Sequence, residues 1–173
     1  MNLSSAVLLL SSALLLFAGT ASPDEWDPDP TPPILEVTHR QDIRAVYDVK
    51  DDLRSAGIGK GLYYVRGLLE AYKDMDVDPK ALHISIVLHG KAAYQLLNDE
   101  AYQNHTGDPF TVNPNDKVVA ELVRHGVSVE ICHVTMKAHG WTADDLLPGV
   151  LMVHDAYTRM IDLQQEGYAY IRF

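Results

Sequence analysis

The stretch DKVVAELVRHGVSVEIC, residues 116–132, contains the pattern that decides the fold. Its first part, residues 116–126, predicts a helix, with Asn115 suited to the N-cap and Gly126 to the left-handed position that follows a helix end. Its second part, VSVEIC at 127–132, alternates apolar and polar residues, which is typical of a strand. A helix that leads through one glycine into a strand is a unit from which α/β sheets are built.

The same alternation extends in both directions from this stretch. The apolar patterns predict strands at residues 43–49, 82–88, 127–132, 150–153 and 168–173. They predict helices at residues 61–75, 91–102, 116–126 and 156–167, with a short helical piece at 135–140. Strands separated by helices form right-handed crossovers and a mainly parallel sheet. We therefore expect one α/β domain of three layers, α/β/α, with about five mainly parallel strands.

The composition excludes several classes of function. The formal net charge is −10, from 24 acidic and 14 basic residues, so neither nucleic acid nor an anionic membrane surface is an expected partner. The single cysteine allows no intramolecular disulfide and no multi-cysteine zinc motif. The eight histidines lack the spacing of known metal motifs, and no glycine-rich loop fits a dinucleotide or a phosphate. We therefore expect neither a metal nor a cofactor.

The amino-terminal residues predict export. Residues 1–21 contain an apolar run that is short for a membrane span of about 20 residues, followed by the small residues Gly19 and Ala21. We interpret them as a cleaved signal peptide, with an uncleaved anchor as the alternative. Residues 22–40 are rich in proline and aspartate and predict an extended, solvated leader. The predicted domain is 41–173, located in the periplasm and free of the membrane after cleavage.

Two of the predicted strands have one polar face. Because successive side chains of a strand point to opposite faces, Ser128, Glu130 and Cys132 share a face, and His83, Ser85, Val87 and His89 share one in the preceding strand. Parallel strands covered on both sides are nearly continuously apolar, so this face predicts a cleft or a subunit contact. Asp48, which ends the first strand, is a candidate for the wall of that cleft, with simple solvation as the alternative.

Cys132 stands where chemistry is expected in such a sheet, since ligands bind at the carboxyl ends of parallel strands. His133 and Lys137 follow it closely, and His89 holds the equivalent place after the preceding strand. Neighbouring cations favour the thiolate, which is the reactive form of cysteine. We therefore expect an accessible, reactive Cys132 tuned by these three side chains. The alternative is a small buried hydrophobic residue with no chemical role.

Several segments together resemble one family. LHG after the second strand, HGVSVEIC, LLPGV and LQQEGY are similar to the DsrE/DsrF-like family of sulfur-relay proteins, and in particular to its exported single-domain members. The resemblance covers about residues 41–173. It implies a flavodoxin-like sheet, assembly into trimers or hexamers, and a cysteine that accepts and passes on sulfane sulfur as a persulfide. That cysteine corresponds to Cys132 in this sequence.

Two hypotheses of function follow. The first is a periplasmic sulfur carrier, or a sulfurtransferase-like enzyme, that exchanges sulfur through Cys132 with donor and acceptor proteins or with small sulfane-sulfur compounds. The alternative is a non-catalytic oligomeric binding or scaffold protein with a structural cysteine. A homo-oligomer is expected in both cases, because the polar strand face and the apolar ending YAYIRF are suited to subunit contacts.

Overall fold

The computed structural model describes residue 32 and residues 34–173. The predicted signal peptide and the first part of the predicted leader lie outside the described residues. The fold is that of the compact unit Val37–Phe173. Within the described residues, no helix is both long enough and apolar enough to cross a membrane.

A five-stranded sheet forms the centre of this unit, and every neighbouring pair of strands is parallel. Its strands are β1 (Ile43–Val49), β4 (Leu82–Leu88), β5 (Ser128–Cys132), β6 (Leu151–Val153) and β7 (Ala169–Arg172). They lie in the order β6-β5-β4-β1-β7, so the first strand along the chain is next to the last. The predicted α/β fold with five parallel strands is confirmed.

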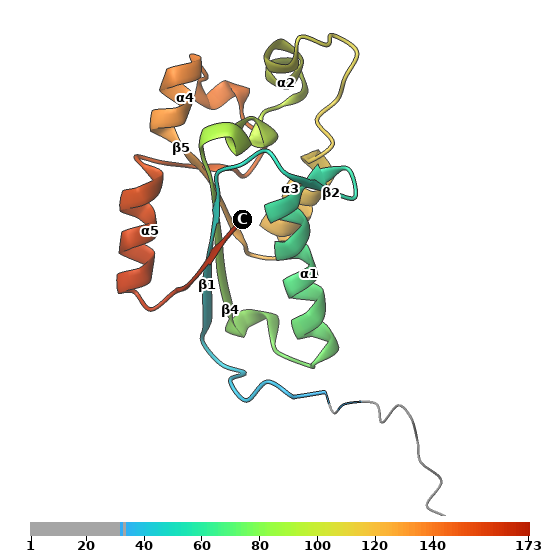
Figure 1. The fold of residues 1–173 in the computed structure, drawn as a ribbon, viewed down its shortest axis with the longest axis vertical. Helices are drawn as coiled ribbons and strands as arrows, with labels where there is room; N and C mark the ends of the chain where they lie inside the picture. The colour runs from blue at the N-terminus through green and yellow to red at the C-terminus, as the bar shows by residue number, and fades with distance from the viewer. Residues whose placement is uncertain (1–31, 33) are drawn as a thin grey trace, which may run out of the picture. The chain divides into compact units, whose positions relative to one another are not determined.

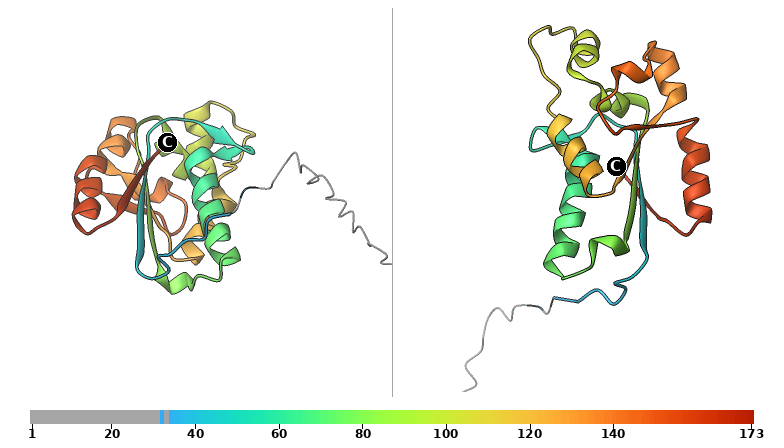
Figure 2. Two further views of the ribbon diagram at one scale, coloured as in Figure 1. Left: turned by 60° about the horizontal axis from the view of Figure 1, so that its bottom comes forward. Right: turned by 180° about the vertical axis from the view of Figure 1, so that it is seen from behind.

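Helices cover the two faces of the sheet unequally (Figures 1 and 2). One face packs against both α1 (Lys60–Asp74) and α3 (Asp116–Arg124), whereas the other packs against α5 (Ala156–Gln165). Near the carboxyl ends of the strands lie α2 (Asp99–Thr106) and α4 (His133–His139). The remaining elements are the 3-10 helices η1 (Pro79–Ala81), η2 (Gly90–Leu96) and η3 (Ala143–Asp145) and the antiparallel pair β2 (Arg54–Ser55) and β3 (Ile58–Gly59).

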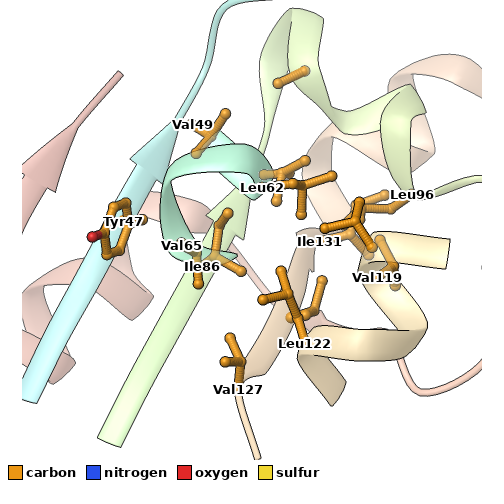
Figure 3. Packing of buried hydrophobic residues seen from close by; sticks show 14 of the residues in the cluster. Tyr47, Val49, Leu62, Val65, Ile86, Leu96, Val119, Leu122, Val127 and Ile131 are labelled. Carbon is orange, nitrogen blue, oxygen red and sulfur yellow. The ribbon is translucent and has the colours of Figure 1, made fainter. Parts of the chain in front are cut away.

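The larger apolar core fills the space between the sheet and helices α1 and α3. Figure 3 shows Leu62 of α1 and Leu122 of α3 packing toward Ile86 and Ile131 of the sheet. A smaller core lies on the opposite face beneath α5, and its members are Val46, Val87, Cys132, Ala156, Met160 and Leu163. Ile131 and Cys132 thus belong to opposite faces, which confirms the alternation expected from the sequence.

The structure corrects the local predictions at three places. The predicted helix 91–102 is interrupted, because the side chain of Asn98 accepts the N–H of Ala101 and starts a new helix, α2. Asn115 precedes α3 as expected but does not cap it, since its Oδ1 accepts the N–H of Gly59 at 2.7 Å. The short pair β2–β3 was not predicted, because each of its strands is only two residues long.

Candidate functional site

Cys132 is the last residue of β5, and α4 begins at the next residue. Its side chain lies in the smaller core, in the same cluster as Val87 of β4 and Ala156 and Met160 of α5. Only 3% of the residue is exposed. The sequence predicted an accessible thiol, but α5 covers this face of the sheet, so the thiol is buried in the described chain.

A partly buried ion pair helps to hold α5 over this face. Arg159 donates from Nε to one carboxylate oxygen of Glu130 at 2.9 Å and from Nη2 to the other at 3.1 Å. Glu130 is 1% exposed and also accepts the hydroxyl of Ser128. These hydrogen bonds satisfy a carboxylate that would be costly to bury alone. The polar strand face that predicted a cleft or a subunit contact is therefore, within the chain, the docking face of α5.

A second buried polar group lies at the carboxyl ends of β1 and β4. The carboxylate of Asp48 is within hydrogen-bond distance of two side chains. The imidazole Nε2 of His89 lies 2.7 Å from Oδ1, and the hydroxyl of Tyr170 donates to Oδ2 at 2.5 Å. The Nε of Arg172 lies 3.9 Å from Oδ2. The ring of His89 also meets the ring of Tyr157 on α5 in an edge contact, with the centroids 5.3 Å apart.

The environment of Tyr170 shows the influence of the carboxylate. Partial burial, followed by the hydrogen bond to Asp48, raises the pKa of Tyr170 to about 12. The hydroxyl is therefore protonated at neutral pH and able to donate to Asp48. Sequence reasoning missed Tyr170, although the alternation of YAYIRF already placed its side chain opposite that of Ile171.

The register of the sheet brings the predicted site residues Cys132 and His89 together. Leu88 of β4 is the partner of Ile131 of β5, so the next residues, His89 and Cys132, fall beside each other at the carboxyl ends. Both side chains lie on the face covered by α5, as their contacts with that helix and its core show. Asp48, predicted as a possible wall of a cleft, belongs to the same group through its contact with His89.

The other two predicted site residues lie on α4. His133 is half-buried and Lys137 is exposed, and they are one helical turn apart on the same side of the helix. Neither side chain makes a hydrogen bond or an ion pair with another described residue, whereas His89 makes its hydrogen bond with Asp48. Of the three side chains predicted to tune the thiol, only His89 has a hydrogen-bond partner among the described residues.

A separate hollow opens at the carboxyl ends of the strands, with a volume of about 370 Å³. Its lining residues are Asp52, Gly90, Lys91, Tyr94, His105, His139 and Trp141. Burial, and then the neighbouring His139, lower the pKa of His105. Cys132 is not part of this lining. No group of three metal-ligating side chains occurs among the described residues, here or elsewhere.

Comparison with known proteins gives the family. Residues 56–173 match the DsrE/DsrF-like family, and the chain belongs to that family. No curated protein matches the sequence.

Two solved structures have the same fold. A protein of unknown function from Methanobacterium thermoautotrophicum is 26% identical, with a TM-score of 0.55, over 76% of this chain and 100% of that one. The ychN protein from E. coli is 14% identical, with a TM-score of 0.54, over 76% of this chain and 99% of that one. The likeness to the ychN protein supports the fold alone.

Proposed function

We propose that this protein is a sulfur carrier or sulfur-transfer protein in which Cys132 accepts sulfane sulfur as a persulfide. The observation that supports this most is the position of the only cysteine, beside His89 at the carboxyl ends of two neighbouring strands. Membership of the DsrE/DsrF-like family supports the same function. The sulfur donor and acceptor are proteins or small sulfane-sulfur compounds.

Access to the thiol is part of the proposal, because Cys132 is buried beneath α5. Sulfur reaches Cys132 when α5 moves away from the sheet. This helix covers a much smaller core than α1 and α3 do, which favours its local opening. His133 and Lys137, at the start and in the middle of α4, are the side chains that we assign to tuning the thiolate and the persulfide anion.

The alternative function, an oligomeric binding or scaffold protein, is favoured by the same burial. A thiol that is 3% exposed among apolar side chains is also what a structural cysteine requires. The two functions differ in whether the folded protein takes up sulfur.

Sulfur uptake is the test that separates them. After incubation with polysulfide, intact mass spectrometry should show one added sulfur atom per wild-type chain, removed by a reductant. Cys132→Ala should show none, and Cys132→Ser provides a second control of similar size. If the wild type takes up no sulfur although its thiol can be alkylated in the folded state, the scaffold function replaces the carrier function.

Location and assembly complete the proposal. We propose a periplasmic protein that begins near Ser22, because the apolar run and the small residues before it suit a signal peptidase. Amino-terminal sequencing of the protein from its host would contradict this if Met1 were retained.

We also propose a homo-oligomer, trimeric or hexameric, since apolar side chains such as Tyr157 and Ile161 of α5 are exposed. Light scattering that found a stable monomer would contradict it.

A further inference from the structure

We infer that His89 takes the proton of the Cys132 thiol during sulfur transfer, and that Asp48 is the positioning residue that orients the His89 imidazole. This inference rests on the proposed function and concerns the same site. It extends that function by giving the thiol a specific base and the base a specific partner.

The first step concerns which nitrogen of His89 holds the proton. The ionised carboxylate of Asp48 can only accept hydrogen bonds, and it lies 2.7 Å from Nε2. Nε2 therefore donates to Asp48, and Nδ1 of the neutral imidazole is left as the acceptor. The hydroxyl of Tyr170 donates a hydrogen bond to the other carboxylate oxygen, and this bond holds Asp48 in its orientation.

The second step concerns the thiol. No hydrogen bond joins Nδ1 of His89 to another described residue, so this nitrogen is free to accept a proton. The register that pairs Leu88 with Ile131 places Cys132 next to His89 on the same face of the sheet. Asp48, His89 and Cys132 thus lie at the carboxyl ends of the adjacent strands β1, β4 and β5 and supply an orienting group, a base and a nucleophile.

The third step is the chemistry, with a small persulfide, R–S–SH, as the sulfur donor. The thiol of Cys132 gives its proton to Nδ1 of His89, and the thiolate attacks the terminal sulfur of the donor. A sulfur–sulfur bond forms at Cys132 while the sulfur–sulfur bond of the donor breaks. The leaving thiolate, R–S⁻, takes the proton from His89. The products are R–SH and the Cys132 persulfide, so sulfur is transferred without any external oxidant or reductant.

The chain contains a matched control pair. His83 lies near the amino end of β4, on the same face as His89, and its Nε2 is 3.5 Å from Oδ1 of Asp42, the residue that precedes β1. They provide the same functional groups far from Cys132. His83→Gln and Asp42→Asn therefore control for the loss of an imidazole or a carboxylate as such.

The experiment measures the rate of sulfur transfer from glutathione persulfide to Cys132 between pH 6 and 10, by intact mass. His89→Gln should slow the transfer about a hundredfold near neutral pH. The rate of this variant should recover at higher pH, where hydroxide ionises the thiol. Asp48→Asn should slow it about tenfold, because an amide can donate to Nε2 and so stabilise the wrong tautomer. His83→Gln and Asp42→Asn should stay within about twofold of the wild type. An unchanged pH profile in His89→Gln would overturn the inference.

Two further measurements keep the outcomes separate. Alkylation of Cys132 by iodoacetamide, over the same pH range, requires loss of the same proton without any sulfur transfer. If the wild type is alkylated with the predicted dependence on His89 but takes up no sulfur, the proposed function fails and the proton-accepting role stands. If the His89 or Asp48 variants do not fold, nitrogen NMR of the wild type decides. The inference requires that the neutral imidazole of His89 carries its proton on Nε2. A proton on Nδ1 would contradict it.

Discussion

Two histidine–aspartate pairs link the opposite ends of β1 and β4, and they differ in separation and burial. The first, His83 and Asp42, lies at the amino ends of the strands, with its atoms 3.5 Å apart and its side chains 46% and 61% exposed. The second, His89 and Asp48, lies at the carboxyl ends, at 2.7 Å, with side chains 6% and 5% exposed. The comparison teaches that a histidine and an aspartate brought together by neighbouring strands do not by themselves make a site, whereas burial and a short, fixed hydrogen bond at the carboxyl ends distinguish the second pair.

The surroundings explain the difference. Water reaches the first pair, and Asp42 also accepts a hydrogen bond from Arg44 at 2.8 Å, so neither partner depends on the other. Water is largely excluded from the second pair, and Asp48 is held by both His89 and Tyr170. In such a site an unpaired polar group is costly, and the geometry is correspondingly well defined.

The largest expected effect that separates the two pairs is on stability. Asp48→Ala leaves both the Nε2 of His89 and the hydroxyl of Tyr170 without an acceptor, so we expect the free energy of unfolding to fall by about 3 kcal/mol. Asp42→Asn, which keeps a side chain suited to the positive φ of 50° at this position, should change it by less than about 0.5 kcal/mol. Urea unfolding followed by circular dichroism measures both values. Equal losses in the two variants would break the comparison.

A smaller effect is expected at alkaline pH. The pKa of Tyr170 and the pKa of Tyr47 are each about 12, mainly through burial, against about 10 in an unfolded chain. Because the folded-state values are raised, both tyrosines contribute stability that is fully present below about pH 10 and is lost as the pH rises through about 12. The unfolding free energy should therefore decline over this range. Tyr47→Phe should make the decline less steep.

The hydrogen bond to Asp48 also raises the pKa of Tyr170, after burial. Asp48→Asn should consequently lower this pKa, whereas Asp42→Asn should leave it unchanged. Phenolate absorbance measured as a function of pH, with Tyr170→Phe subtracted to isolate the one residue, gives the answer. An unaltered Tyr170 titration in Asp48→Asn would mean that the carboxylate has little influence at this end of the sheet.

The sequence was sufficient for the elements of the fold and for the faces of its strands, because both depend on local periodicity. It placed His89 and Cys132 correctly at strand ends. It could not predict the contact between His89 and Asp48, which are 41 positions apart, because that contact depends on β1 and β4 being neighbours in the sheet. Local patterns do not encode the order of strands.

The burial of Cys132 was only the alternative interpretation of the sequence, for a related reason. The three residues that pack with it from α5 are Ala156, Met160 and Leu163, whose spacing of four and three residues marks one apolar helix face. That spacing predicts a buried face but does not say which side of the sheet it covers. The connections from β1 to β6 run across the sheet in one direction, whereas the connection from β6 to β7 runs back in the other. Because such crossovers are right-handed, the helix of the returning connection lies on the opposite face.

The central claim is that Cys132 reacts in the folded protein, when α5 opens locally, and the rate of its alkylation under native conditions tests this most directly. The rate is measured with a small thiol reagent at increasing concentrations of urea, all below the unfolding transition. We predict that Cys132 is labelled much faster than global unfolding permits. We also predict that the labelling rate is nearly independent of urea concentration at low urea, because local opening exposes little surface. Labelling that increases with urea as steeply as the global unfolding equilibrium would contradict the claim, because the thiol would then react only in the unfolded chain.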